Sequence, residues 1–312
     1  MYLELNSWGK QGVFWGYILA CSFQAILMHN SGTTSESRLE IRSTTVVLMQ
    51  DVAKLLFSLS MIRMNSPSWR HCVDQIASHK KYALYYLIPA ALYFLYNNLA
   101  FVSLSNFDPT TYFVLMQFRI VIVTFCSIFF LKKIVSTNQW LGVVIVTSGA
   151  LMKILDYSNV TMSFSSIHIL PFLLVQLQLV LSAAAGLYNE YLLQGRDRPS
   201  TEIQNIFMYL NSILVGLVGS SQSVSQRVIS AEPLTIFAMV ITGSAAGLFA
   251  SYFLRYLDSV RKSIASAIEL WITAVLSAIV FGYPISGVAF LGLAVITFGI
   301  IIYSRKLGKK EK

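Results

Sequence analysis

Long apolar segments recur along the whole chain, and each is long enough to cross a lipid bilayer as a helix. A spanning helix needs about 20 mainly apolar residues, because lipid offers no hydrogen-bond partner to an exposed backbone. Such segments lie at 13–29, 44–64, 82–105, 110–131, 139–155, 167–193, 203–219, 234–254, 264–282 and 286–303. The pattern predicts an all-α integral membrane protein with ten transmembrane helices joined by short connections.

The composition agrees with a membrane protein and argues against an enzyme. Hydrophobic residues make up 55% of the chain, charged residues 12%, and the mean hydropathy is +0.64, all far from soluble usage. Only four histidines occur, near span ends or in connections, and no Ser-His-Asp order or metal-binding pattern is present in the sequence. The three cysteines are interpreted as structural. We therefore expect no catalytic residue, no cofactor and no metal.

The basic residues are placed as expected for a membrane protein whose two termini face the cytosol. With that orientation, 17 of the 23 basic residues are cytosolic: Lys10, Arg63, Arg70, Lys80, Lys81, Lys132, Lys133, Arg196, Arg198, Arg255, Arg261, Lys262, Arg305, Lys306, Lys309, Lys310 and Lys312. The positive-inside rule then supports an even number of helices. The net charge of +9 is explained by this placement, so no nucleic-acid partner is predicted.

The second half of the chain repeats the first. A shift of 150 residues aligns 108–150 with 258–300 without a gap and pairs, among others, Gly142 with Gly292 and Gly149 with Gly299. Each copy covers the fourth and fifth helix of its half, which indicates five-helix repeats at 1–155 and 156–312. An odd number of helices inverts the second copy, and inverted repeats support alternating access to a midplane site. This feature favours a transporter.

Charged residues inside the spans mark the candidate binding region. Asp51 and Lys54 lie three apart on one helical face and are expected to neutralise each other. Arg119 lies in the middle of its span, where a permanent cation needs an anion. It can pair with Glu269, its mate at the 150-residue offset, or present its planar fork to phosphate oxygens. Glu190 lies in the sixth span. Structural or gating roles are predicted for Asp51, Lys54, Glu190 and Glu269.

Several blocks, in order, resemble the nucleotide-sugar transporters of the branch that carries CMP-sialic acid, UDP-galactose and UDP-N-acetylglucosamine, within the drug/metabolite transporter superfamily. The blocks are Asp51-Val52-Ala53-Lys54, Tyr96-Asn97-Asn98-Leu99-Ala100-Phe101, Thr111-Tyr112, Gln117-Phe118-Arg119, Phe130-Leu131-Lys132-Lys133 with Gln139-Trp140, Ser182-Ala183-Ala184-Ala185-Gly186-Leu187-Tyr188-Asn189-Glu190, Gln204-Asn205 with Tyr209, and Arg255-Tyr256 with Asp258 and Lys262. Each block is short, but together they extend from residue 51 to the last span.

The resemblance implies an antiporter that exchanges a cytosolic nucleotide sugar for a lumenal nucleoside monophosphate, without a cofactor. It implies substrate-binding roles for Asn97, Asn98, Tyr112, Arg119, Ser182, Asn205, Tyr209 and Lys262. In this resemblance Arg119 and Lys262 hold the phosphates, and Tyr112 stands at the family's tyrosine in the same motif as Arg119. The positions that read the base and ribose are matched by Asn97 or Asn98, Ser182, Asn205 and Tyr209. It also implies a Golgi or endoplasmic-reticulum membrane, and the Lys309-Lys310-Glu311-Lys312 tail resembles a retrieval signal.

Two departures bear on the substrate. Arg119 stands where the family commonly has lysine, and Lys262-Ser263-Ile264 stands where it commonly has Lys-Gly-Phe. The signature of the guanine-specific branch is absent from the sequence, so a pyrimidine nucleotide is favoured, with UDP-galactose or UDP-N-acetylglucosamine as the expected cargo. The alternatives are CMP-sialic acid, another metabolite exported on the same fold, and a scaffold that does not transport. Small residues at 183–186 and 243–247 permit close helix packing within one chain or in a homodimer.

Overall fold

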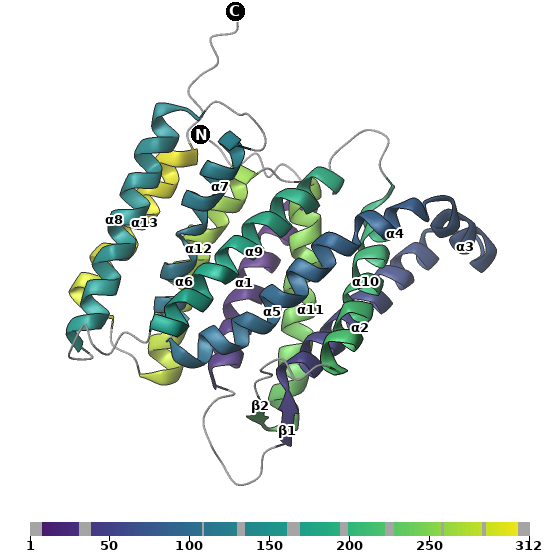
Figure 1. Ribbon diagram of the computed structural model, residues 1–312, viewed down its shortest axis with the longest axis horizontal. Helices are drawn as coiled ribbons and strands as arrows, with labels where there is room; N and C mark the ends of the chain where they lie inside the picture. The colour runs from purple at the N-terminus through teal and green to yellow at the C-terminus, as the bar shows by residue number, and fades with distance from the viewer. Residues whose placement is uncertain are drawn as a thin grey trace, which may run out of the picture.

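The protein is a bundle of long helices, seen in a computed structural model that describes residues 8–30, 39–107, 109–129, 135–160, 169–193, 199–221, 228–256, 259–282 and 285–304 (Figure 1). The helices are α1 (Trp8–Asn30), α2 (Ser43–Met64), α3 (Trp69–Ser78), α4 (Lys81–Tyr85), α5 (Leu87–Asn106), α6 (Pro109–Met116), α7 (Arg119–Phe129), α8 (Thr137–Val160), α9 (Ile169–Leu193), α10 (Thr201–Ser221), α11 (Pro233–Tyr256), α12 (Ser259–Phe281) and α13 (Gly287–Ser304). Two short strands, β1 (Leu39–Arg42) and β2 (Val228–Ala231), complete the described structure.

Five helices are long and apolar enough to cross a membrane: the described apolar parts of α1, α2, α5, α9 and α11. Two shorter apolar helical stretches, Ala265–Phe281 and Gly287–Tyr303, belong to α12 and α13. The helix ends agree with the hydropathy pattern to within a few residues, because lipid requires the backbone to be hydrogen-bonded throughout each crossing. The remaining predicted spans coincide with α8, α10 and the pair α6 and α7.

The prediction of one continuous helix over 110–131 was wrong, because the helix is interrupted at Gln117 and Phe118. The backbone N–H groups of these two residues bond to the carbonyls of Val114 and Leu115 at 3.0 and 3.1 Å, three residues back instead of four. The side-chain amide of Gln117 also donates to the carbonyl of Phe113 at 3.2 Å. Such a tightened turn marks a local change of helix direction, and Arg119 is the first residue after it.

Helix α3 and the strands β1 and β2 were not predicted from the hydropathy pattern. The segment 65–81, expected to be a connection, contains helix α3, whose N-terminus is capped by the Ser68 hydroxyl accepting from the backbone N–H of His71. The predicted span 82–105 is divided at Tyr86 into α4 and α5. The strands β1 and β2 pair antiparallel, with Leu39 opposite Ala231 and Arg42 opposite Val228. The fold is therefore helical with one small ladder, and this ladder joins the entry to α2 to the entry to α11.

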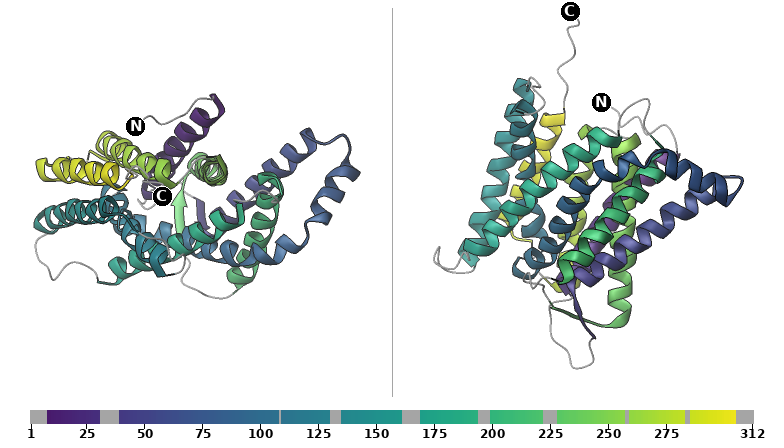
Figure 2. Two further views of the ribbon diagram at one scale, coloured as in Figure 1. Left: turned by 90° about the horizontal axis from the view of Figure 1, so that it is seen from above. Right: turned by 45° about the vertical axis from the view of Figure 1, so that its right-hand side comes forward.

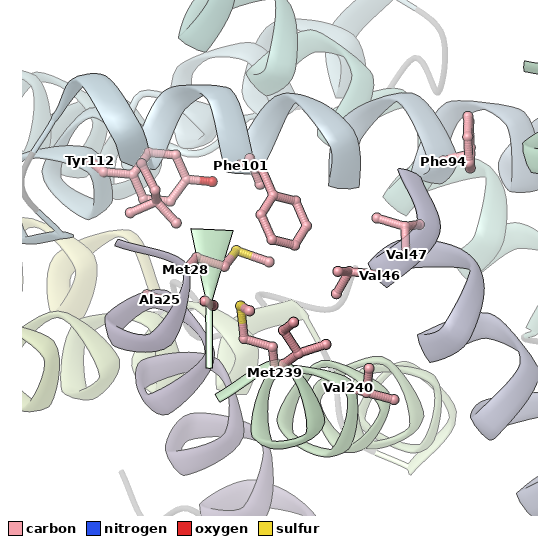
Figure 3. Close-up of a cluster of buried hydrophobic side chains, with 13 residues drawn as sticks. Ala25, Met28, Val46, Val47, Phe94, Phe101, Tyr112, Met239 and Val240 are labelled. Atoms are coloured by element: carbon pink, nitrogen blue, oxygen red, sulfur yellow. The ribbon is translucent and has the colours of Figure 1, made fainter. Parts of the chain in front are cut away.

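Helices far apart in sequence pack side by side in the bundle (Figure 2). The main pairs are α1 with α11, α5 with α9, α2 with α10, α2 with α11, α5 with α10, α1 with α12, and α8 with α13. The largest buried hydrophobic cluster lies where α1, α2, α5, α6 and α11 meet, and Figure 3 shows Met28 and Met239 pointing toward each other near Phe101. Tyr112 belongs to this cluster, so the apolar core reaches the first of the predicted site residues.

Helices α8 and α13 approach closely through glycines. A Cβ on Gly142 would lie 2.7 Å from the backbone of Tyr303, one on Gly149 would lie 2.9 Å from the carbonyl oxygen of Gly292, and one on Gly299 would lie 2.8 Å from the backbone nitrogen of Val146. Only hydrogen fits at these positions. Gly142, Gly149, Gly292 and Gly299 are also the glycines that coincide when the sequence is shifted by 150 residues.

Replacing Gly149 with alanine should destabilise the protein, because the new methyl group would collide with backbone atoms that have no room to move. Overpacking of this kind costs about 1–3 kcal/mol. Gly186→Ala is the matched control, since a Cβ there meets nothing within 4 Å and alanine is the better helix former. The melting temperature in detergent should fall for Gly149→Ala alone. Equal melting temperatures for the two variants would contradict the close packing of α8 and α13.

Candidate functional site

Arg119 lies at the break between α6 and α7, with its side chain half-buried in the bundle. One guanidinium nitrogen, Nη1, donates to the Ser182 hydroxyl of α9 at 3.1 Å. Within the described ranges, Arg119 makes no ion pair with Glu269, so the structure does not contain the first of its two predicted partners. A guanidinium has five N–H donors. Among the described residues, the Ser182 hydroxyl is the hydrogen-bond acceptor of this side chain, so most of its N–H donors are left for a ligand.

Tyrosine hydroxyls and Glu269 lie around this cation. The charges of Arg119 and Glu269 both act on the hydroxyl groups of Tyr17 and Tyr96. Glu269 lies on α12 and is 6% exposed. Side chains from α1, α5, α6, α7, α9 and α12 therefore share one polar region in the middle of the bundle. We call it the central cluster: Tyr17, Tyr96, Tyr112, Arg119, Gln178, Ser182 and Glu269.

Gln178 of α9 holds this region together. Its side-chain nitrogen donates to the Tyr112 hydroxyl at 2.8 Å, and its side-chain oxygen accepts from the Ser103 hydroxyl at 3.0 Å. Gln178 is fully buried and Tyr112 is 3% exposed. Because the Tyr112 hydroxyl accepts this hydrogen bond, its own proton remains available to a ligand or to Tyr96. The amide thereby fixes the positions of α5, α6 and α9 relative to one another.

The opposite side of the helix break contacts α12. The Ser266 hydroxyl donates to the side-chain oxygen of Gln117 at 3.1 Å. Ser266 lies one turn before Glu269 on α12. The break that positions Arg119 is therefore hydrogen-bonded to the helix that carries Glu269.

A second buried polar group surrounds α2. Lys54 and Asp51 form the ion pair that their spacing predicts, with Nζ and Oδ1 2.5 Å apart. The Ser212 hydroxyl of α10 donates to the other Asp51 oxygen, and Nζ of Lys54 lies 4.8 Å from the centre of the Tyr209 ring. Gly247 of α11 leaves space for the lysine stem, since a Cβ there would lie 2.9 Å from Cδ of Lys54. Both charges are neutralised inside the protein.

The predicted asparagine ligands have different environments. Asn98 accepts a hydrogen bond from Thr44 at 3.1 Å and donates to the carbonyl of Phe94 at 2.9 Å, so it links α5 to α2. Asn97 is half-buried on α5. Asn205 is 2% exposed on α10, and its side-chain nitrogen has no hydrogen-bond partner among the described residues. Asn205 and Tyr209 share one face of α10 beside the Asp51–Lys54 pair.

Two predicted residues lie partly beyond what the structure describes. Lys262 is on α12 and Glu190 is on α9, but their side chains lie outside the described set. Among the predicted site residues, Tyr112, Arg119, Ser182 and Glu269 come together in the central cluster. The structure also brings 243–247 against α2 within one chain, since a Cβ on Gly243 would overlap the Gln50 side chain.

Three members of the central cluster were not among the predicted site residues. Gln178 carried a usable signal, because a glutamine in the middle of an apolar span must find a partner. Tyr17 and Tyr96 carried a weaker signal, since the chain has 16 tyrosines and most pack against other helices. Among the described residues, no group of three or more His, Cys, Asp or Glu side chains is arranged to hold a metal ion.

A family model described as nucleotide-sugar transporter matches residues 13–304 of this chain. A fruit-fly protein, the UDP-galactose transporter senju of Drosophila melanogaster, is 32% identical over 309 residues, covering 84% of this chain and 78% of the relative. UDP-galactose translocator 1 of Caenorhabditis elegans is 27% identical over 285 residues, with the same coverage of each chain. CMP-sialic acid transporter 1 of Oryza sativa subsp. japonica is 24% identical over 276 residues, covering 83% of each chain.

A solved crystal structure has the same fold. It matches with a TM-score of 0.65 at 12% sequence identity, and the alignment covers 93% of this chain and 95% of the other. Identity at this level carries information on the fold alone. The helical arrangement described above is therefore one that occurs in a protein of very different sequence.

Proposed function

This chain belongs to the nucleotide-sugar transporter family, and from that premise we propose that it exchanges a pyrimidine nucleotide sugar for a nucleoside monophosphate across a Golgi or endoplasmic-reticulum membrane. The family consists of transporters rather than enzymes. Substrate, counter-substrate and membrane are the parts of the proposal that go beyond membership of the family.

The observation that carries the proposal is that Arg119, a cation within a span, donates to one neutral hydroxyl among the described residues. A guanidinium inside a bilayer needs compensation, and Ser182 supplies only one neutral acceptor. A phosphate group would accept two parallel hydrogen bonds from the planar fork. Tyr17 and Tyr96 belong to the same central cluster, and their hydroxyl groups are neutral donors for further oxygens of the ligand.

Matched charge explains why exchange suits such a site. A nucleotide sugar carries a diphosphate diester, and the returning monophosphate is also a dianion near neutral pH. Both need about the same positive charge, which we assign to Arg119 and Lys262, the latter by resemblance. Exchange of equal charges makes the cycle largely insensitive to membrane potential. The residues require no metal and no covalent step.

Helix packing supports an architecture of two inverted five-helix repeats. In such a repeat, α1, α2 and α5 of the first half correspond to α9, α10 and α11 of the second, the pair α6 and α7 corresponds to α12, and α8 corresponds to α13. The contact of α1 with α11 then has its counterpart in the contact of α9 with α5. The contact of α2 with α11 has its counterpart in that of α10 with α5. The pairs α2 with α10 and α8 with α13 are each their own counterpart. The contacts of Gly149 with Ile296 and of Gly299 with Val146 exchange under the same correspondence. Alternating access then follows from movement of one repeat against the other.

Uracil is the base we favour. Two of the relatives reported above are named as UDP-galactose proteins, and a third as a CMP-sialic acid transporter. The buried side-chain nitrogen of Asn205 is a donor without a partner among the described residues. It can donate to O4 of uracil, whereas cytosine carries an amino group at that position. UDP-galactose and UDP-N-acetylglucosamine are the expected sugars, and CMP-sialic acid remains the alternative.

Nucleotide-dependent stabilisation of the purified protein tests the substrate class. A bound ligand raises stability by about 2.7 kcal/mol at 100 times its dissociation constant, so UMP should raise the melting temperature clearly, CMP less, and GMP hardly at all. UDP-galactose and UDP-N-acetylglucosamine should compete with UMP. Asn205→Asp, which replaces the amide donor with an acceptor, should reduce the preference for UMP. No shift with any nucleotide would instead favour an exporter of another metabolite on this fold.

A further inference from the structure

The short helix α3 combines an exposed apolar face with a cluster of basic residues. In helical projection its apolar residues form one continuous arc. One part of this arc packs on the protein: Cys72 is 4% exposed and belongs to a buried cluster with Ile62, Tyr82 and Tyr86, with Ile76 beside it. The other part is uncovered, since Trp69 is 63% and Val73 is 60% exposed. Trp69, Val73 and Ala77 lie four residues apart along this uncovered face, all exposed.

The position of α3 relates this face to the edge of the bilayer. It connects the end of α2, where Met64 is 78% exposed, to α4, where Leu84 is 71% exposed. Large apolar side chains uncovered at the ends of spanning helices face lipid. Figure 1 shows α3 at the outer edge of the bundle, beyond α2 and α4. The helix therefore lies where the hydrocarbon region gives way to headgroups, the level at which tryptophan is enriched.

The basic residues around α3 indicate which kind of lipid its exposed face contacts. Arg63, Arg70, Lys80 and Lys81 flank or belong to α3, and Asp74 is the single acidic residue in the segment 63–81. The guanidinium of Arg63 lies 5.5 Å from the centre of the Trp69 ring, so the cation and the tryptophan form one unit. Arg70 borders the apolar arc and can extend its charged end to phosphate while its stem stays on the apolar side. An uncharged lipid would leave these cations without counterions.

We propose that α3 is an interfacial helix that binds anionic phospholipid headgroups, with Trp69 and Val73 inserted below them. The proposal rests on the membrane setting of the proposed function but not on its substrate. Amphipathic helices of this kind lie in the interface plane with their apolar face in the acyl boundary. Each basic residue close to an anionic surface contributes roughly a fivefold preference for it. The cluster thus tethers the connection between α2 and α5 to one leaflet.

Quenching of Trp69 by brominated lipids tests this directly. The full chain is placed in nanodiscs of phosphatidylcholine alone or mixed with phosphatidylserine, with bromine on the acyl chains near the headgroup. The Trp69 signal is the difference between the unmodified protein and Trp69→Phe. We expect quenching in both discs and stronger quenching with brominated phosphatidylserine. The triple variant Arg70→Gln/Lys80→Gln/Lys81→Gln should lose the excess for phosphatidylserine, whereas Asp74→Asn should increase it.

Contradictory results are readily recognised. Unquenched Trp69 emission would mean that water, a second copy of the chain or another protein covers this face, and it would overturn the proposal. Equal quenching by the two lipids in all variants would contradict the proposal that the basic residues bind anionic headgroups. Inorganic phosphate added to phosphatidylcholine discs should leave Trp69 emission unchanged, and a change equal to that with phosphatidylserine would assign the cluster to free anions. None of these readouts depends on transport, so this proposal can fail while nucleotide exchange is intact.

Discussion

Replacing Arg119 with alanine should abolish nucleotide exchange and reduce nucleotide affinity by roughly 100-fold or more, because two charge-assisted hydrogen bonds to phosphate contribute about 1.5–3 kcal/mol each. The fold should survive, since the hydrogen bond that Arg119 would lose among the described residues is the one to Ser182. Binding of UMP to the detergent-solubilised variant, followed by its melting temperature without ligand, measures both effects.

Two further variants separate phosphate binding from simple positive charge. Arg119→Lys keeps the charge but loses the planar fork. It should retain part of the affinity, since the nucleotide-sugar transporters that this chain resembles commonly have lysine at this position. Ser182→Ala removes the hydroxyl that holds Nη1 and should weaken binding less than Arg119→Ala. Unchanged UMP affinity in a folded Arg119→Ala variant would show that Arg119 does not bind the phosphate.

Replacing Asp51 with asparagine should destabilise the protein by about 3–5 kcal/mol, because it leaves Lys54 charged inside the bundle without a carboxylate. Lys54 is 5% exposed and has the Tyr209 ring as its other neighbour, which cannot replace a full negative charge. A loss of this size corresponds to a fall in melting temperature of roughly 10 °C. Thermal unfolding in detergent without nucleotide measures it.

The double variant Asp51→Leu/Lys54→Met is the control for this expectation. Removing both charges exchanges a buried ion pair for apolar side chains of similar size, which is often close to neutral for stability. The double variant should therefore be much more stable than Asp51→Asn. If it is folded but does not transport, the pair also acts in the cycle. A single variant as stable as the unmodified protein would contradict the closed ion pair described here.

The spanning helices could be predicted from the sequence because the bilayer leaves little freedom. Every backbone group of a crossing must be hydrogen-bonded within its own helix, so uninterrupted apolar segments such as 44–64 become helices such as α2. The break at Gln117 could not be predicted in this way. The side chain of Gln117 accepts a hydrogen bond from Ser266, which is distant in sequence and gives no local signal. Helix α3 was missed because it is amphipathic rather than apolar, and a search for long apolar segments does not detect it.

The charged residues of the site could be predicted from the sequence, but the residues they contact could be predicted much less well. A cation or carboxylate within a span is costly, so Arg119, Glu269, Asp51 and Lys54 are conspicuous in the sequence. Which charges pair is decided by helix packing. The pair three residues apart on α2 was predicted correctly because one helix holds both members. The partner of Arg119 depends on how α7 lies against α9 and α12, and the structure places Ser182 rather than Glu269 at its Nη1.

Counter-exchange in proteoliposomes tests the central claim most directly. Vesicles preloaded with UMP, CMP, GMP or nothing are offered labelled UDP-galactose, UDP-N-acetylglucosamine, CMP-sialic acid and GDP-mannose, with Lys262→Ala and Arg119→Ala as inactive controls. We predict rapid, saturable uptake of a UDP-sugar that depends on internal UMP and is lost in both variants. Uptake driven by CMP with CMP-sialic acid would move the substrate to the alternative. Uptake that is independent of any internal nucleotide, or that persists in Arg119→Ala, would contradict an antiporter that binds phosphate through the central cluster.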